Sequence, residues 1–280
     1  MSDTLRRLAV LITCHNRRAL TLRCLSSLFT QQGLEGVALS VFLVDDGSTD
    51  GTAAAVSTDF PVVDILFGDG NLFWNRGMHL AFARAMEGDY DFYLWLNDDV
   101  DLLPDSLCRA VAVAEPLSLV VGTTQERETG KPGYGGWRAT SRLNPFRFEL
   151  VEPSASVQRC DTVSGNFVLV TREAALRLGN LDPFYSHACG DTDYGLAATR
   201  SGVPILVMPG FVGFCRVNPM RDSLRDPSLP VLERWRKLTD RRALPPRDWV
   251  YLCRKHAGAI WPLLAVFPYL KFWLLAWRRS

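Results

Sequence analysis

Two adjacent aspartates follow an apolar run in the first half of the chain. Residues 92–100 read Phe-Tyr-Leu-Trp-Leu-Asn-Asp-Asp-Val, so the run ends abruptly in Asn97, Asp98 and Asp99. Such a run, bounded by polar residues, is typical of a buried strand in a parallel sheet. Neighbouring carboxylates repel each other and are costly to desolvate unless a positive charge lies beside them. Their oxygens suit Mg²⁺ or Mn²⁺, so the run predicts a divalent-metal site. The alternative is a solvated turn in which Asp99 caps a helix.

A second pair of acids follows another apolar segment. Residues 39–44 are apolar and lead directly into Asp45 and Asp46, followed by Gly-Ser-Thr-Asp-Gly-Thr. Ser48 or Thr49 can cap the helix that is expected to start there. Capping is the alternative role for the pair, but it needs one such residue rather than two acids after an apolar strand.

Strands and helices alternate around these acids. We predict strands over residues 8–12, 39–44, 62–67 and 92–96, with helices between them. This order predicts right-handed βαβ units and a parallel sheet, which binds ligands beyond the carboxyl ends of its strands. The third helix is expected to begin near Gly77 and to point its N-terminus at this edge, a favourable position for a diphosphate. Phe73 and Trp74 either stack on a ligand or pack the helix onto the sheet.

Two motifs in this half resemble the opening of family-2 glycosyltransferases, which are nucleotide-sugar-dependent enzymes of the GT-A fold. Thr-x-x-Asn-Arg follows the first strand, and Asp-Asp-Gly-Ser-Thr-Asp-Gly-Thr follows the second. The resemblance implies an α/β fold, with a doubly wound, mostly parallel sheet flanked by helices. The nucleotide-binding residues that it implies are Thr13, Asn16, Arg17, Asp45, Asp46, Asn75, Gly77 and Asp98.

The family's usual metal motif is Asp-x-Asp, whose last acid binds the ion that bridges the donor diphosphate. The resemblance therefore makes Asp99 the direct ligand of Mg²⁺ or Mn²⁺. Asp98 becomes a contact to the sugar nucleotide or a group that supports the ligand. Asn97 replaces the first acid of the motif, which argues against two side-chain ligands because an amide binds the ion less well than a carboxylate.

The second half of the chain carries the residues expected to meet the sugar and the acceptor. Gly165 and Asn166 resemble a glycine-containing strand that lines this pocket in the family. A later Cys-Gly-Asp-Thr-Asp run resembles the family's Glu-Asp-x-Asp, with Gly190 in place of the glutamate. The resemblance makes Asp191 the general base and adds Asp193 to the sugar or acceptor site. One displacement assisted by one base implies inversion at the anomeric carbon. The alternative role for Asp191 is a plain helix cap.

Residues 123–152 are rich in Gly, Pro, Arg and Thr and are expected to be irregular. They form either a lid that excludes water from a bound donor or a disordered loop. Family members often carry a histidine downstream of the base, but residues 210–218 contain none, and Arg216 is a candidate diphosphate contact there.

The C-terminal part of the chain differs in composition. Residues 221–254 are basic, and residues 257–277 are apolar with Lys271 as their only charge. This run is long enough to span hydrocarbon, but its prolines and Lys271 argue against a straight span. Tryptophans and flanking basic residues suit an interfacial anchor on an anionic membrane. The alternative is an extension packed on the catalytic domain or on a second subunit.

The expected domain organisation follows from these segments. A GT-A domain is predicted over residues 1–215, with a nucleotide-binding half at 1–100 and an acceptor half at 101–215. Residues 216–280 form a helical, amphipathic or apolar extension that is expected at the membrane surface.

Overall composition excludes some other classes. The 280 residues have a formal net charge of +1, so no global field argues for nucleic acid as a partner. Seven cysteines without a C-x-x-C pair argue against a disulfide framework or a zinc site and suit a reducing cytosol. The polar N-terminus shows no signal peptide. We expect a cytoplasmic protein at the inner face of the cytoplasmic membrane.

The expected function is metal-assisted, inverting transfer of a sugar from a UDP- or dTDP-sugar to a hydroxyl of a cell-surface polysaccharide or a lipid-linked acceptor. Asn-Asp-Asp-Val, with Phe-Trp-Asn-Arg-Gly upstream, resembles rhamnosyltransferase-like members and makes dTDP-rhamnose a candidate donor. Two alternatives are a catalytically inactive relative that binds sugar nucleotides as a scaffold, and a sugar-phosphate nucleotidyltransferase. The latter needs a glycine-rich loop after the first strand, and residues 13–18 contain no glycine. Acceptor, linkage and oligomeric state stay open.

Overall fold

The computed structural model describes residues 5–216, 226 and 228–277 of the chain. The strands of its central sheet are β1 (Arg6–Cys14), β2 (Val37–Asp45), β3 (Asp64–Phe67), β4 (Phe92–Leu96), β5 (Asp101–Leu102), β6 (Leu119–Gln125), β9 (Gln158–Cys160), β11 (Phe167–Thr171) and β12 (Ile205–Phe214). Their spatial order is β3-β2-β1-β4-β11-β6-β12-β5, with β9 paired on β12.

The first four strands of this order are all parallel, as the sequence predicted. β11 then lies antiparallel between β4 and β6, and β12 pairs in parallel with β6. The carboxyl ends of β1, β2 and β4 therefore meet at one edge, where Cys14 is in register with Asp45. Polar residues that are far apart in the sequence are brought together at this edge.

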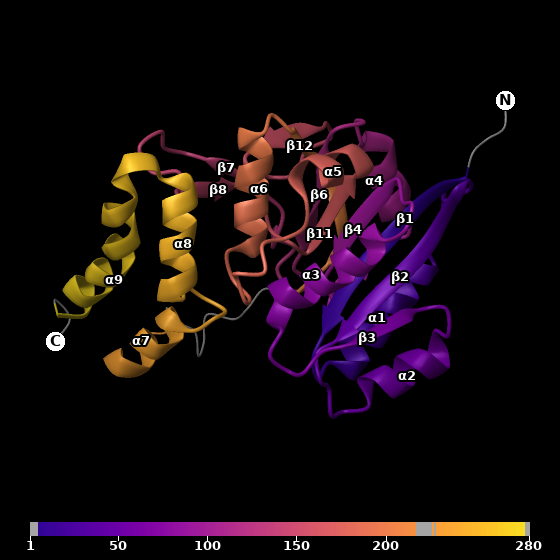
Figure 1. Ribbon diagram of the computed structural model, residues 1–280, viewed down its shortest axis with the longest axis horizontal. Helices are drawn as coiled ribbons and strands as arrows, with labels where there is room; N and C mark the ends of the chain where they lie inside the picture. The colour runs from indigo at the N-terminus through magenta and orange to yellow at the C-terminus, as the bar shows by residue number, and fades with distance from the viewer. Residues whose placement is uncertain (1–4, 217–225, 227, 278–280) are drawn as a thin grey trace.

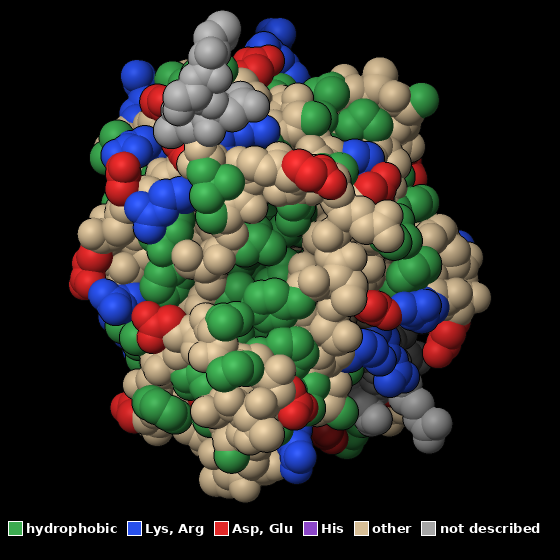
Figure 2. All heavy atoms as spheres, turned by 90° about the vertical axis from the view of Figure 1, so that its right-hand side faces the viewer, with side chains coloured by type: hydrophobic (Ala, Val, Ile, Leu, Met, Phe, Trp, Pro, Cys, Tyr) green, Lys and Arg blue, Asp and Glu red, His purple; other side chains and the backbone are tan. Residues whose placement is uncertain are grey.

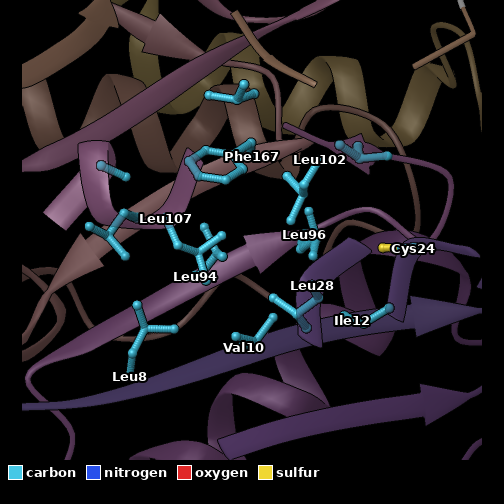
Figure 3. Close-up of a cluster of buried hydrophobic side chains, with 14 of the residues drawn as sticks. Leu8, Val10, Ile12, Cys24, Leu28, Leu94, Leu96, Leu102, Leu107 and Phe167 are labelled. Atoms are coloured by element: carbon cyan, nitrogen blue, oxygen red, sulfur yellow. The ribbon is translucent and has the colours of Figure 1, made fainter. Parts of the chain in front are cut away.

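Helices cover both faces of the sheet. They are α1 (Arg18–Phe29), α2 (Thr52–Asp59) and α4 (Ser106–Val113), and, across the sheet, α3 (Phe73–Met86), α5 (Arg172–Leu178) and α6 (Gly190–Arg200). The alternating directions of strand side chains divide the core in two. Leu8 and Val10 of β1 face Leu28 of α1 and Leu107 of α4, as Figure 3 shows. Leu11, by contrast, belongs to the cluster that includes α3.

Several predicted element boundaries were wrong. α3 begins at Phe73 rather than near Gly77, and α2 begins at Thr52 rather than at Ser48 or Thr49. Residues 123–152 are not irregular throughout. They contain the end of β6 and the strands β7 (Gly136–Ala139) and β8 (Phe148–Leu150). These two strands form a second sheet together with β10 (Thr162–Val163), in the order β10-β7-β8. Strands this short carry too little alternating hydrophobicity to be recognised from the sequence.

The C-terminal extension consists of α7 (Val231–Thr239), α8 (Pro246–His256), a short 3₁₀ turn (Gly258–Ile260) and α9 (Trp261–Trp277), and its first residues, 217–225 and 227, lie outside the described part. These helices lie together beyond α6, on the side of the molecule away from α1 and α2 (Figure 1). α8 is attached to α6 through a buried carboxylate and through a hydrogen bond from Arg200 Nη1 to the carbonyl of Lys255 at 2.6 Å. Asp193 of α6 accepts a hydrogen bond from Lys255 Nζ at 2.6 Å and lies 2.7 Å from His256 Nε2.

The last helix is largely unburied. Its large exposed side chains include Leu263, Val266, Phe267, Leu270, Leu274 and Leu275. Within the described residues, one helical stretch, 258–275, is long and apolar enough to cross a membrane, and only 6 % of it is buried. Packing of α9 onto the catalytic domain, one of the alternatives from the sequence, is therefore not observed.

The opposite end of the molecule has a different surface. Figure 2 shows that acidic and basic side chains are interspersed on the face beside α2, with apolar side chains in a central hollow. No single-sign field covers this face, in keeping with a net charge of +1.

We predict that Asp193→Ala lowers the free energy of unfolding by about 2–3 kcal/mol, because it leaves the buried His256 without its carboxylate partner and removes one of the two carboxylates that pair with Lys255. Urea unfolding followed by tryptophan fluorescence measures this loss. Asp59→Ala, at the exposed end of α2, is the control and is expected to change stability by less than about 0.5 kcal/mol. Equal stability of the two variants would show that Asp193 does not anchor α8.

Candidate functional site

A cavity of about 580 Å³ opens at the carboxyl ends of β1 and β4. The turn after β1, the start of α3, the turn before β11 and the residues that enter α6 form its walls. It brings together eight of the residues predicted from the sequence, namely Thr13, Arg17, Asp46, Asp98, Asp99, Gly165, Asn166 and Asp191.

The two adjacent aspartates share one cation. Arg17 Nη1 lies 3.0 Å from Asp98 Oδ1 and 3.0 Å from Asp99 Oδ2. Asp98 is almost fully buried, and its Oδ2 has no hydrogen-bond partner among the described residues. Burial raises the pKa of Asp98 to about 7, against the opposing effect of Arg17. A single guanidinium therefore compensates this pair incompletely, and the site favours additional positive charge.

Asn97 holds a wall of the cavity. Its Oδ1 accepts a hydrogen bond from Trp74 Nε1 at 2.6 Å, and its backbone N–H donates to the carbonyl of Asn166 at 3.0 Å. The Trp74 ring lies directly against Gly165, where a β-carbon would overlap it. Trp74 therefore packs α3 against the edge of the sheet. Both Trp74 and Gly165 line the cavity.

Asp46 organises the loop between β3 and α3. Its carboxylate accepts hydrogen bonds from the backbone N–H groups of Gly70, Leu72 and Phe73, at 2.8, 3.2 and 2.9 Å. The N–H of Asn75 in turn donates to the carbonyl of Ser186 at 3.1 Å. Because the N–H groups of Phe73 and Asn75 in the first turn of this helix already have protein partners, they do not support the predicted diphosphate site at its N-terminus.

Asp191 lies at the start of α6 and lines the same cavity as the acid pair. Its Oδ2 accepts the N–H of Gly165 at 3.0 Å, and its Oδ1 accepts the N–H of Thr192 at 2.7 Å. Burial raises the pKa of Asp191 above the ordinary aspartate value, and these two hydrogen bonds oppose the shift. The carboxylate is thus fixed in orientation, lines the cavity and binds a proton more readily than an exposed aspartate does.

Asn75 and Gly77 do not reach the cavity. Asn75 is fully buried, and its Nδ2 donates to the carbonyls of Asp182 and Tyr185 at 2.8 and 2.9 Å. Gly77 allows α3 to approach Thr13, since a β-carbon there would overlap the threonine side chain. These positions join α3 to its neighbours, so they do not support the predicted contacts with the nucleotide.

Asp193 also lies outside the cavity, which corrects its predicted role at the sugar or acceptor. Residues two apart on an α-helix project about 200° apart around its axis, so Asp191 and Asp193 face opposite sides. Asp193 is directed at Lys255 and His256. The helical spacing could have predicted this separation.

Asn16 and Asp45 support the turns beneath the site. Asn16 Oδ1 accepts the backbone N–H of Thr49 at 2.8 Å, and Asp45 Oδ1 accepts that of Ser48 at 2.9 Å. Neither side chain is among those that line the cavity. Their predicted contacts with the nucleotide are therefore not supported by their positions.

Of the cavity residues that come from the last third of the chain, the sequence predicted Asp191 and Arg216 but not His187, Cys215 and Arg242. His187, Cys215 and Arg242 line the cavity together with Arg216. Burial lowers the pKa of His187 to about 4, so this ring is neutral near pH 7. The basic composition after residue 220 was a signal for such a contribution, but it did not identify individual residues.

Backbone strain is concentrated around this site. In the described chain, the non-glycine residues with positive φ are Asn16, Phe73 and Cys189, at 51°, 56° and 74°. Phe73 and Cys189 line the cavity, and Asn16 adjoins Arg17. Such conformations persist only where the surroundings hold them, and they are concentrated at functional sites.

The donor groups fit a divalent metal that also takes ligands from a substrate. No cluster of three or more His, Cys, Asp or Glu side chains that could hold a metal alone occurs in the described residues. Asp99 is partly exposed at the cavity, and the adjacent Asp98 has an unpartnered oxygen. One or two carboxylates completed by phosphate oxygens and water are typical of Mg²⁺ and similar hard ions.

Comparison with solved structures places the fold. A mannosyltransferase, PcManGT from Pyrobaculum calidifontis, solved with GDP-Man and Mn²⁺, is 17 % identical with a TM-score of 0.56, covering 96 % of this chain and 71 % of that one. GalNAc-T7, solved with UDP, GalNAc and Mn²⁺, is 15 % identical with a TM-score of 0.56, covering 92 % of this chain and 52 % of that one. At such identities the similarity establishes the fold alone.

Comparison of the sequence itself identifies the family. No curated protein matched the chain significantly. The family profile described as Glycosyl transferase family 2 matches residues 9–175, which is more than half of the chain and includes the turn after β1, both acid pairs and Gly165. The chain therefore belongs to glycosyl transferase family 2 and is a glycosyltransferase with the GT-A fold.

Proposed function

We propose that the protein transfers a sugar from a nucleoside-diphosphate sugar to an acceptor hydroxyl with inversion, and that Asp191 is the general base. The observation that carries the proposal is that Asp191, fixed by the N–H groups of Gly165 and Thr192, faces the same cavity as the Asp98–Asp99 pair. One cavity is thus lined both by a carboxylate that can act as a base and by an acid pair that can bind the metal of a metal–diphosphate complex.

The proposed step is a single displacement. The acceptor oxygen attacks the anomeric carbon while the bond from that carbon to the diphosphate oxygen breaks, and the electron pair leaves with the nucleoside diphosphate. Asp191 takes the proton of the acceptor hydroxyl. Because the raised pKa of this carboxylate makes it a stronger base than an exposed aspartate, it suits this role.

Asp99 is the proposed metal ligand, with Asp98 beside it. When bound, Mg²⁺ or Mn²⁺ supplies electrostatic stabilisation of the charge that develops on the leaving diphosphate. Arg17, Arg216 and Arg242 line the same cavity and supply fixed positive charge for an anionic donor.

The donor is proposed to be a UDP- or dTDP-sugar, with dTDP-rhamnose as the first candidate. This choice rests on the resemblance of residues 97–100 and 73–77 to rhamnosyltransferase-like members. Of the two similar solved structures, one holds UDP with Mn²⁺ and the other GDP-Man with Mn²⁺, so they support a nucleotide donor without selecting its base. Incubation with these sugars and measurement of released nucleoside diphosphate tests transfer directly and excludes an inactive scaffold.

We predict that UDP or dTDP binds the wild-type protein at least about tenfold more tightly with Mn²⁺ than with a chelator, as measured by calorimetric titration. Asp99→Ala is expected to remove this metal dependence, because it removes the proposed ligand. Asp105→Ala, at an exposed carboxylate beside α4, is the control and should retain it. Absence of binding by UDP, dTDP and GDP under all conditions would contradict the proposed function.

We predict that Asp191→Asn lowers kcat at least about 100-fold while the affinity for nucleotide with Mn²⁺ stays within about twofold of wild type. The wild-type rate should fall as pH decreases through a pKa above the ordinary aspartate value of about 3.9, because protonation of Asp191 removes the base. NMR of the product reports the anomeric configuration. A retained configuration, or a variant with wild-type kcat, would contradict this assignment.

The acceptor is proposed to be a lipid-linked or membrane-bound saccharide, with the protein at the inner face of the cytoplasmic membrane. α9 supports this by its exposed apolar side chains, and residues 231–277 contain nine Lys or Arg against three Asp or Glu. Tyr269 of α9 donates to the carbonyl of Leu244 at 2.9 Å, two residues from Arg242 in the cavity wall. A membrane bound by α9 would thus lie near the site.

We predict that the triple variant Leu263→Glu, Leu270→Glu, Leu274→Glu no longer floats with vesicles containing phosphatidylglycerol, whereas the wild-type protein does, because charges on α9 oppose its insertion. The matched control replaces the exposed Val62, Leu143 and Leu176 by Glu and should still float. If the wild-type protein does not bind these vesicles, and light scattering shows a dimer that the α9 variant loses, α9 is a subunit interface.

A further inference from the structure

We propose that Arg17 is an internal counter-ion of the acid pair, which it releases when a metal and a sugar nucleotide bind, and that its guanidinium then contacts the donor diphosphate. The inference rests on the proposed function, since it takes Asp99 as the metal ligand. In this proposal, Arg17 weakens metal binding in the free protein and strengthens binding of the donor.

The first observation is the geometry of the ion pairs. A single nitrogen, Arg17 Nη1, lies 3.0 Å from an oxygen of Asp98 and 3.0 Å from an oxygen of Asp99. The guanidinium therefore lies between the two carboxylates, where a second cation would experience repulsion. A metal that approaches Asp99 must compete with Arg17 for this negative charge.

The second observation is that the Arg17 side chain can leave while its backbone stays. The side chain is 47 % exposed, whereas those of Asp98 and Asp99 are 6 % and 20 % exposed. The preceding residue, Asn16, is held at φ 51° by hydrogen bonds with Ser48 and Thr49. The turn thus fixes the base of a long, half-exposed side chain, and the carboxylates that it contacts remain in place.

The third observation is the balance of charge. One guanidinium faces two carboxylates, and Asp98 Oδ2 is buried without a hydrogen-bond partner among the described residues. A divalent ion would neutralise the pair more completely. Arg17 would then be left beside a cation unless an anion entered with the metal, and a diphosphate accepts the paired N–H groups of a guanidinium.

Metal and nucleotide binding should therefore be positively coupled through Arg17. Without nucleotide, Arg17 opposes the metal. When nucleotide is bound, Arg17 contacts the diphosphate and no longer competes with the metal for the acid pair. Each ligand therefore strengthens the binding of the other. Removal of the guanidinium should have opposite effects on the two affinities, which loss of a simple diphosphate contact would not produce.

The test compares Arg17→Met with Arg18→Met, its matched control, which removes the same charge from the next residue. Binding of Mn²⁺ alone is followed by the electron paramagnetic resonance signal of the free ion, and binding of UDP and dTDP with Mn²⁺ by calorimetry. Arg17→Met is expected to bind Mn²⁺ alone about tenfold more tightly than wild type and nucleotide with Mn²⁺ about tenfold more weakly. Arg18→Met should match wild type in both measurements.

The outcomes separate this inference from the proposed function. If the wild-type protein binds no nucleotide with Mn²⁺, the proposed function fails. If wild type binds nucleotide but Arg17→Met binds Mn²⁺ alone no better, or Arg18→Met has the same effect, the counter-ion inference fails and the proposed function stands. Arg17→Lys, which keeps the charge, guards against misfolding and should bind Mn²⁺ alone as weakly as wild type.

Discussion

Two neighbouring carboxylates at the end of a buried strand are the constraint that the rest of this site accommodates. Asp98 and Asp99 are adjacent in the sequence and are separated from the end of β4 only by Asn97, so the backbone gives them little freedom to separate. Negative charge in such a place is costly unless cations or hydrogen-bond donors surround it. Arg17 supplies the only ion pairs that the described residues make to this pair, and the cavity supplies room for a metal and an anionic ligand.

The two departures from the family's motifs form one packing arrangement. Asn97 accepts the indole N–H of Trp74, and Gly190 leaves room for the side chain of Asn75, which a β-carbon at residue 190 would overlap. Trp74 and Asn75 are adjacent in the first turn of α3. The first turn of this helix therefore packs against residues 97 and 190, and the residue types at these two positions are matched to it. Neither departure removes Asp99 or Asp191 from the cavity.

Local patterns and the family resemblance predicted the parallel half of the sheet and eight of the site residues that line the cavity, because apolar strands with polar ends mark the edge of the sheet. They did not predict the roles of Asn75 and Asp193. Those roles depend on which face of a helix meets which neighbour, and for Asp193 the partners lie more than 60 residues away. The strands β7 and β8 were missed for another reason, since strands this short carry too little alternating hydrophobicity to be identified.

The extension after residue 215 is part of the site rather than an appendage. Arg242 reaches the cavity, and the guanidinium of Arg241 lies 4.7 Å from the centre of the Phe73 ring. Phe73 itself is strained and is held by Asp46, so the β3–α3 loop and the extension constrain the same residue. A force that reorients α8 and α9, such as insertion of α9 into a membrane, would therefore be transmitted to the cavity wall. The contact between the Phe73 ring and Arg241 is therefore one route by which the extension can influence the cavity.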